Sequence, residues 1–277
     1  MAAKKYVCKV CGYTHEGSEA PSVCPLCKAG ASEFEAVKEK KKGIDTNSDI
    51  YAIIYSAVVV VIVAFLLAGV SSALSKRQNE NIRLDKQKQI LASLNIKNDA
   101  NPAEKYKKTI IFDRVVNSKG KLVKEKGGFA LTNENISSDS LPLYVAKVDG
   151  EFKYIIPMTG NGLWGGIWGY LALNADCNTI YGVYFSHASE TPGLGAEIAG
   201  DKFQSCFTKD KDGNPVVKIV YNEKGEVVLE VNKEKSDANY HIDAISGATI
   251  TCEGLDKMLK SGLAPYYNYL NTIKEEK

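Results

Sequence analysis

The sequence lacks an excess of charge of either sign, with 35 Lys and Arg residues against 33 Asp and Glu residues and a formal net charge of +2. A chain that neutralises several phosphates would carry a basic patch or stripe, so no nucleic-acid partner is expected. The sequence also shows no internal repeat, no low-complexity tract and no Gly-x-Gly-x-x-Gly placed between a strand and a helix. The last absence argues against direct binding of a nicotinamide dinucleotide.

The composition is that of a globular protein, with 44% hydrophobic and 25% charged residues among 277. This length suits about two ordinary domains of roughly 100–200 residues each. Changes in composition along the chain predict five parts. They are a cysteine-bearing segment at 1–36, a charged linker at 37–49, a membrane helix at 50–75, a helical connector at 76–97 and an α+β domain at 98–277.

The run from 50 to 75 holds 26 residues without one charge. As a helix it would be about 39 Å long, which exceeds the roughly 30 Å hydrocarbon core of a bilayer. A buried core helix would show polar residues at helical spacing, and a cleaved signal would stand at the extreme N-terminus. We therefore predict a single membrane-spanning helix. Basic residues flank both ends of this run, so the positive-inside rule indicates the orientation of the helix in the membrane only weakly.

Two hairpins are predicted in the last part of the chain. Residues 143–158 read as two strands joined at Asp149–Gly150, and residues 218–231 repeat the pattern with a turn near Lys224–Gly225. Strands interleaved with helical segments predict an α+β fold. Ordinary structural roles are expected for the cysteines and histidines without ligand spacing: Cys177, Cys206, Cys252, His15, His187 and His241.

Four cysteines form two Cys-x-x-Cys pairs on either side of a twelve-residue loop: Cys8, Cys11, Cys24 and Cys27. Each pair can hold one side of a tetrahedral ion, and the spacing allows zinc or iron. A metal would stabilise a segment of about 36 residues that cannot bury enough core alone. Two disulfides would need an oxidising compartment, and bridges within the pairs would close strained loops. Since thiolates need a reducing environment, we expect this end in the cytoplasm.

The residues around these cysteine pairs resemble the rubredoxin-like tail of rubrerythrins. The shared positions are Tyr6, Cys8, Cys11-Gly12-Tyr13, Cys24-Pro25, Cys27 and Phe34. The resemblance implies a mononuclear iron that carries one electron. A structural zinc ribbon is the alternative.

A second motif, DAISGAT at 243–249, precedes a predicted helix capped at or near Thr251. Gly247 and Ala248 leave little bulk beside the Thr249 hydroxyl. A helix start offers free backbone N–H groups and the positive end of the dipole, where a phosphate binds. The geometry suits a phosphate held at Thr249, but a plain helix cap with small residues explains the motif equally well.

The motif resembles the tag recognised by flavin transferases, which join FMN through its phosphate to the final threonine. The resemblance implies a covalent phosphoester of FMN on Thr249, with Thr251 as a weaker alternative. It also places Asp243, Ser246, Gly247 and Ala248 at the cofactor site. A threonine hydroxyl is a poor nucleophile by itself, which agrees with attachment by a separate enzyme.

Longer stretches, among them GNGLWGGIWGYLAL at 160–173 and HASETPGLGAEI at 187–198, resemble the C subunit (NqrC) of sodium-translocating NADH:quinone oxidoreductases, over residues 44–277. The resemblance implies an α+β FMN-binding domain that relays electrons from an iron–sulfur centre to a second flavin subunit on the way to quinone. No complete active site is expected on this chain alone. The loops implied near the flavin contribute Leu163, Trp164, Glu190, Thr191, Gly193 and Leu194.

This resemblance implies a single-pass protein of a bacterial inner membrane, with a cytoplasmic N-terminus and the FMN domain on the periplasmic or outer side. The expected partners are other flavin and iron–sulfur subunits, the lipid bilayer and a flavin transferase. The metal segment departs from the pattern of the NqrC family, whose members ordinarily begin near the membrane helix. The alternatives are the RnfG protein of the ferredoxin-driven Rnf complex, which shares the threonine tag, and a non-redox membrane anchor with a zinc ribbon.

Overall fold

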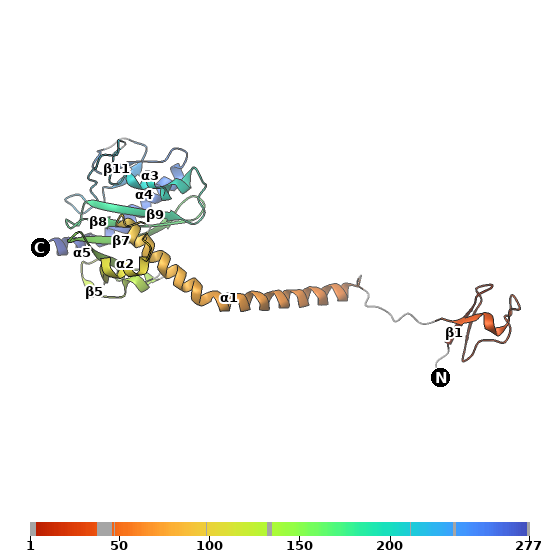
Figure 1. The fold of residues 1–277 in the computed structure, drawn as a ribbon. Helices are drawn as coiled ribbons and strands as arrows, with labels where there is room; N and C mark the ends of the chain where they lie inside the picture. Colours follow the sequence, from red (N-terminus) through yellow and green to blue (C-terminus); the bar gives the residue numbers. More distant parts are fainter. Residues whose placement is uncertain are drawn as a thin grey trace. The chain divides into compact units, whose positions relative to one another are not determined.

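A computed structural model describes residues 4–37, 46, 48–97, 99–131, 135–210, 212–234 and 237–275. The contacts within the chain divide it into two units, Met1–Leu74 and Ser75–Lys277. Figure 1 shows the helices and strands of both units. The charged linker predicted at 37–49 lies mostly outside the described residues.

The N-terminal segment forms a small antiparallel sheet with the strand order β2-β1-β3. Its elements are β1 (Lys4–Cys8), β2 (Thr14–Gly17), the short 3-10 helix η1 (Ala31–Glu33) and β3 (Phe34–Ala36). The first cysteine pair lies in the turn after β1, where the Gly12 amide donates to the Cys8 carbonyl. In the second pair, the Lys28 amide donates to the Cys24 carbonyl. The two turns therefore present their thiols from similar backbone loops.

The helix α1 runs from Asp49 to Ser93. It is long and apolar enough to cross a membrane by length and composition, and none of the residues that the structure describes buries its apolar stretch. Exposed side chains such as Phe65, Leu66 and Leu67 are typical of a helix that faces lipid. The predicted helical connector continues this helix without a break. The helix ends before Asn95, whose left-handed φ of 61° stops it.

The second unit is built on a six-stranded antiparallel sheet with the order β5-β4-β6-β7-β8-β9. Its strands are β4 (Ile110–Val116), β5 (Leu122–Lys124), β6 (Leu141–Val148), β7 (Glu151–Asn161), β8 (Gly166–Leu173) and β9 (Ile180–His187). The hairpin predicted at Asp149–Gly150 is confirmed. Both residues have positive φ values, 51° and 88°, as a two-residue hairpin turn of type I′ requires.

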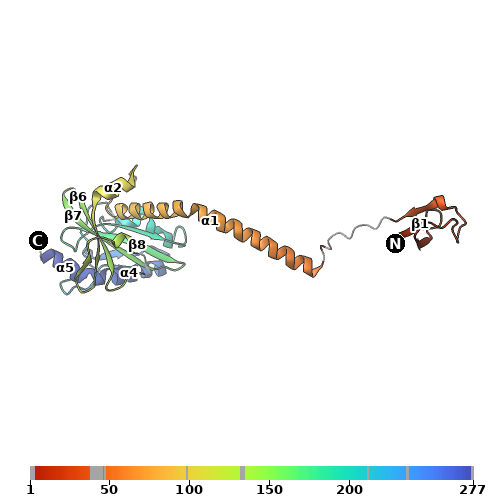
Figure 2. The ribbon, with the colours of Figure 1, turned by 90° about the horizontal axis from the view of Figure 1, so that it is seen from below.

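Helices cover both faces of this sheet, as Figure 2 shows. The end of α1 packs on one face, where Ile90 and Leu94 meet Tyr144, Ile155 and Tyr170. The opposite face carries the larger core. The helical elements besides α1 are α2 (Pro102–Thr109), η2 (Gly128–Ala130), η4 (Gly195–Ala199), α3 (Asp201–Ser205), α4 (Thr249–Leu263), η5 (Ala264–Tyr266) and α5 (Tyr267–Glu275). The α+β prediction is confirmed.

The second predicted hairpin is only partly right. The turn exists, since Gly225 has a φ of 80°, and its flanks join at the isolated bridge between Tyr221 and Val227. There the Asn222 amide donates to the Glu226 carbonyl and the Val228 amide donates to the Val220 carbonyl. The backbone groups of Tyr221 point away from this bridge and bind the side-chain amide of Asn178, which donates to the Tyr221 carbonyl and accepts from the Tyr221 amide. The end of the segment instead forms β10 (Glu230–Asn232), which pairs in parallel with β11 (His241–Asp243).

Candidate functional site

The four cysteines of the N-terminal segment converge on one point. Their sulfur atoms all lie within 4.8 Å of one another, with Cys8 and Cys27 3.6 Å apart and Cys11 and Cys24 3.5 Å apart. A tetrahedral ion with metal–sulfur bonds of about 2.3 Å would separate its ligands by roughly 3.8 Å. The cluster therefore fits a tetrathiolate metal ion. Cys8 and Cys24 are buried and Cys11 is exposed, so one side of the site faces solvent.

Three loops of the second unit meet at one end of the large sheet. β7 ends and β8 begins there, so the loop 162–165 lies at this end. β9 ends beside it, because His187 pairs with Ile167 at the start of β8. The helix α4 crosses β7 with Gly254 so close to the Asn161 carbonyl that no side chain would fit, which brings the start of α4 to the same place.

The helix α4 begins two residues earlier than the predicted cap at Thr251. Ala248 is the N-cap, and Thr249 is the first helical residue. The Thr249 side chain is exposed, and its Oγ accepts a hydrogen bond of 2.7 Å from the Lys233 ammonium. Thr251 is 2% exposed, and its hydroxyl donates to Glu190 at 2.6 Å. Only Thr249 therefore offers an accessible hydroxyl in this turn of the helix.

Glu190 connects the loop 162–165 to α4. Its side chain is 4% exposed, and the Trp164 amide donates to Oε1 at 2.8 Å while Thr251 donates to Oε2. Burial alone would raise the pKa of this carboxyl, but hydrogen bonds from Thr251 and from the backbone of 163–165 outweigh it and lower the pKa. A Cβ on Gly162 or Gly195 would lie 2.5 Å from the carboxylate oxygens. Glu190, which the sequence predicted as a cofactor contact, is thus an enclosed, ionised side chain that links the loop 162–165 to α4.

Lys233 reaches Thr249 because of the parallel pairing of β10 with β11. Asn232 pairs with Asp243 in this pairing, so both strands end at the same edge. The carboxyl ends of parallel strands and the N-terminus of the following helix make a common place for anions. An ammonium, a hydroxyl and the positive end of the α4 dipole meet there. The arrangement fits a phosphate group.

Exposed apolar side chains lie on the loops that meet at the start of α4 and in its first turn. Leu163 is 46% exposed, Trp164 67%, Leu194 42% and Ile250 55%. Leu194 lies against Gly247, where an added Cβ would come within 2.8 Å of Cδ2. Exposed apolar groups gathered beside a charged anchor are typical of a ligand surface. The residues present therefore fit an aromatic ring system linked to a phosphate.

The other predicted site residues fall into two groups. Asp243, Ser246, Gly247, Thr191 and Gly193 are exposed along the tag and the loop after β9. Ala248 is 4% exposed and packs in the core beneath the tag.

Two further residues of the site, Lys233 and Ile250, were not predicted from the sequence. No short-range pattern marks Lys233, because it depends on a pairing between two three-residue strands. The apolar Ile250 directly after the tag threonine was a usable signal, because α4 turns this residue outward while Thr251 and Cys252 face the core.

Two protein-family models match this chain. The model described as an FMN-binding domain matches residues 162–264, and the model of the rubredoxin-like domain of rubrerythrin matches residues 6–35. The first match holds all three loops of the site, and the second holds all four clustered cysteines. The fold and the sites are those of a flavoprotein with an FMN-binding domain and a rubredoxin-like segment.

The chain is also similar to single proteins over most of its length. The C subunit of the Na(+)-translocating NADH-quinone reductase of Pseudomonas aeruginosa is 28% identical over 241 residues, which covers 75% of this chain and 88% of that protein. The same subunit of Haemophilus ducreyi is 29% identical over 233 residues, covering 74% and 88%. The crystal structure of this subunit from Parabacteroides distasonis is 37% identical, with a TM-score of 0.64, and covers 71% of this chain and 96% of that one. The chain belongs to the family of NqrC, the C subunit of Na(+)-translocating NADH-quinone reductases.

Proposed function

We propose that this chain is the FMN-carrying subunit of a membrane complex that oxidises NADH, reduces quinone and translocates Na⁺, with FMN joined to Thr249 through its phosphate. One observation carries the proposal. The tag threonine is an exposed hydroxyl beside an ammonium and a helix N-terminus, whereas Thr251 is buried and hydrogen-bonded to Glu190. Family membership and the FMN-binding domain support the same function.

Attachment needs an activated flavin, because the phosphate of free FMN has no good leaving group. A flavin dinucleotide supplies one. The Thr249 oxygen attacks the phosphorus on the riboflavin side, a P–O bond of the phosphoanhydride breaks, the nucleoside monophosphate leaves and the hydroxyl proton passes to a base of the transferase. On this chain, Lys233 and the start of α4 neutralise the new phosphodiester, which carries one negative charge. Asp243 and Ser246 form the part of the tag that the transferase contacts.

Bound FMN would take up and release electrons for neighbouring subunits, and the residues of this chain hold it and exclude water from its ring. Leu163, Trp164 and Leu194 offer apolar contact to the ring, with Thr191 and Gly193 at the margin of the surface. Glu190 holds the loop 162–165 in place. Electrons would arrive from an iron–sulfur centre and leave for a second flavin subunit on the way to quinone.

The tetrathiolate segment would bind iron in this proposal. The Cys11 side of the cluster faces solvent, which suits electron exchange with cytoplasmic subunits or a soluble donor. A cytoplasmic iron and an external flavin would be separated by about 30 Å of hydrocarbon, too far for efficient direct transfer. The proposed parts of the chain remain the metal segment at 1–36, linker at 37–49, membrane helix at 50–75, connector at 76–97 and flavin domain at 98–277. The N-terminus would be cytoplasmic and the flavin domain periplasmic or outside, in a bacterial inner membrane.

In-gel flavin fluorescence of the denatured chain tests the attachment, because only a covalent flavin survives denaturation. Thr249→Leu should abolish the fluorescence, and Thr251→Val should retain it. Fluorescence that persists in Thr249→Leu would place the bond elsewhere. Removal of residues 1–43 tests the relay separately: NADH-dependent quinone reduction should fall, and unchanged turnover would exclude an obligatory role of the iron site.

A further inference from the structure

Four polar side chains share one face of the parallel β10–β11 pair. The register sets Glu230 opposite His241 and Asn232 opposite Asp243. Side chains alternate along a strand, so the residues between them, Val231 and Ile242, point into the core, where they are 2% and 1% exposed. The polar face ends at Asp243, which is the first residue of the flavin tag.

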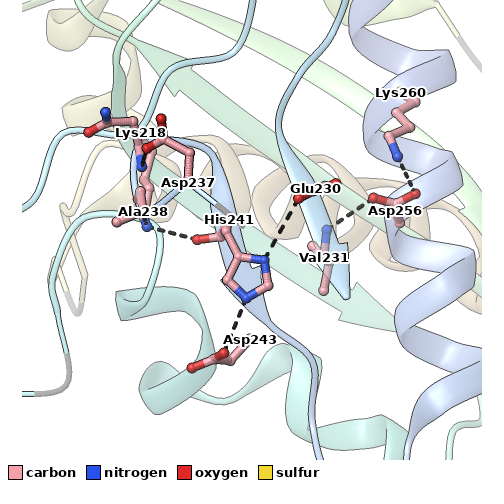
Figure 3. Close-up of polar contacts among 10 residues, drawn as sticks. Lys218, Glu230, Val231, Asp237, Ala238, His241, Asp243, Asp256 and Lys260 are labelled. Atoms are coloured by element: carbon pink, nitrogen blue, oxygen red, sulfur yellow. Dashed lines mark hydrogen bonds and ion pairs between the residues drawn. The ribbon is translucent and has the colours of Figure 1, made fainter. Parts of the chain in front are cut away.

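The imidazole of His241 lies between the carboxylates of Glu230 and Asp243 (Figure 3). Nε2 is 3.2 Å from Asp243 Oδ1, and Nδ1 is 3.9 Å from Glu230 Oε1. An ionised carboxylate can only accept a hydrogen bond, so the contact with Asp243 requires the proton on Nε2, which then donates. The His241 side chain is 10% exposed, whereas the Asp243 side chain is 49% exposed. The nearly enclosed imidazole of His241 therefore donates to the half-exposed carboxylate of Asp243.

The backbone beneath His241 is fixed from two directions. Lys218, which is 7% exposed, donates from Nζ to the His241 carbonyl at 2.8 Å and also to the Ala238 carbonyl. On the neighbouring strand, the Val231 amide donates to Asp256 of α4 at 3.0 Å. Figure 3 shows both anchors on either side of the histidine. These hydrogen bonds hold the backbone of His241 and of the neighbouring strand in place, so the imidazole can orient the Asp243 carboxylate.

We propose that His241 is a positioning residue for flavin attachment, acting through Asp243. The imidazole holds the Asp243 carboxylate in one orientation, so that the transferase meets a preformed acidic contact at the start of the tag. An unrestrained carboxylate samples several rotamers, and ordering it on docking weakens binding. The matching surface on the transferase is cationic or rich in N–H donors. This inference rests on the proposed attachment of FMN to Thr249.

The test is a time course of FMN incorporation into the full chain in detergent, with purified transferase and flavin dinucleotide as donor. His241→Leu removes the donor, and His241→Gln keeps one. The expected result for His241→Leu is a roughly tenfold rise in KM for the chain with kcat within about twofold, because a hydrogen bond to a charged group is lost. His241→Gln should recover most of the wild-type KM. Asp139→Asn, which neutralises an exposed carboxylate outside the β10–β11 pair, is the control and should leave KM unchanged.

A double-mutant cycle separates positioning from general stability. Asp243→Asn should raise KM by itself, and adding His241→Leu to it should have little further effect, since both changes act on one contact. A wild-type KM in His241→Leu, or a full additional rise in the Asp243→Asn background, would overturn the proposal. Different results would contradict the proposed function: no flavin on the wild-type chain, or flavin that is retained in Thr249→Leu.

Discussion

Replacement of Glu190 tests the physical account of the flavin loops most sharply. The buried carboxylate accepts from the Trp164 amide at 2.8 Å and from the Thr251 hydroxyl at 2.6 Å. A hydrogen bond to a charged group contributes about 1.5–3 kcal/mol, and an unpaired buried donor costs a similar amount. Glu190→Ala removes both bonds and leaves the donors of the loop 162–165 without this acceptor. The free energy of unfolding should fall by about 3–5 kcal/mol, a large part of the total of about 5–15 kcal/mol for a domain.

Glu190→Gln should behave very differently. Its amide oxygen can accept from the Trp164 amide, and its NH₂ group can donate to Thr251, whose hydroxyl can turn to accept. Only the charge is lost, so we expect a decrease of about 1 kcal/mol. Urea unfolding followed by tryptophan fluorescence measures these changes, because both tryptophans, Trp164 and Trp168, belong to this unit.

The control is Glu197→Ala, which removes an exposed carboxylate from η4 near the same loop and should change stability by less than about 0.5 kcal/mol. Equal effects of Glu190→Ala and Glu197→Ala would refute the reasoning. So would a Glu190→Gln variant as unstable as Glu190→Ala, since the orientation of the hydrogen bonds would then not matter.

Three further predictions concern charge and metal. The pKa of Glu190 in the folded chain lies below its ordinary 4.5, so the stability that the ionised carboxylate contributes is present above pH 4.5 and is lost as the pH falls through the pKa of the folded state. The difference in unfolding free energy between wild type and Glu190→Gln should therefore shrink as the pH falls through that range. A difference that stays constant would contradict this prediction. Lys233→Met should slow FMN incorporation roughly tenfold, while Lys233→Arg and the exposed control Lys260→Met should not, as in-gel fluorescence would show. Removal of the metal should unfold residues 4–37 and leave the flavin domain folded, as circular dichroism and tryptophan fluorescence would show; a coloured oxidised protein indicates iron and a colourless one zinc.

Local chemistry explains which parts of the fold the sequence predicts. The Asp149–Gly150 turn, the cysteine pairs and the apolar run depend on residues close together in the chain, and each appears as expected. The helix start was misjudged because threonine is a favoured cap, whereas Ala248 occupies that position here. Thr251 instead uses its hydroxyl to bind Glu190, which is 61 residues away in sequence.

The missed parts of the site depend on long-range pairing. Lys233 reaches Thr249 only because two three-residue strands pair in parallel, and such short strands carry little periodic signal. The second hairpin forms its turn and a bridge between Tyr221 and Val227, and the Asn178 side chain binds the outward backbone groups of Tyr221 from a distant part of the chain. Single-sequence patterns record neither contact. Both follow from tertiary packing.

The central claim is a phosphoester between FMN and the exposed threonine at the start of α4. Mass spectrometry of the tryptic peptide 236–257, from protein made in a host with its transferase, measures it directly. The account predicts a peptide heavier by FMN less one water, with fragment ions that place the added mass on Thr249. An unmodified peptide, or added mass on Thr251, would contradict it.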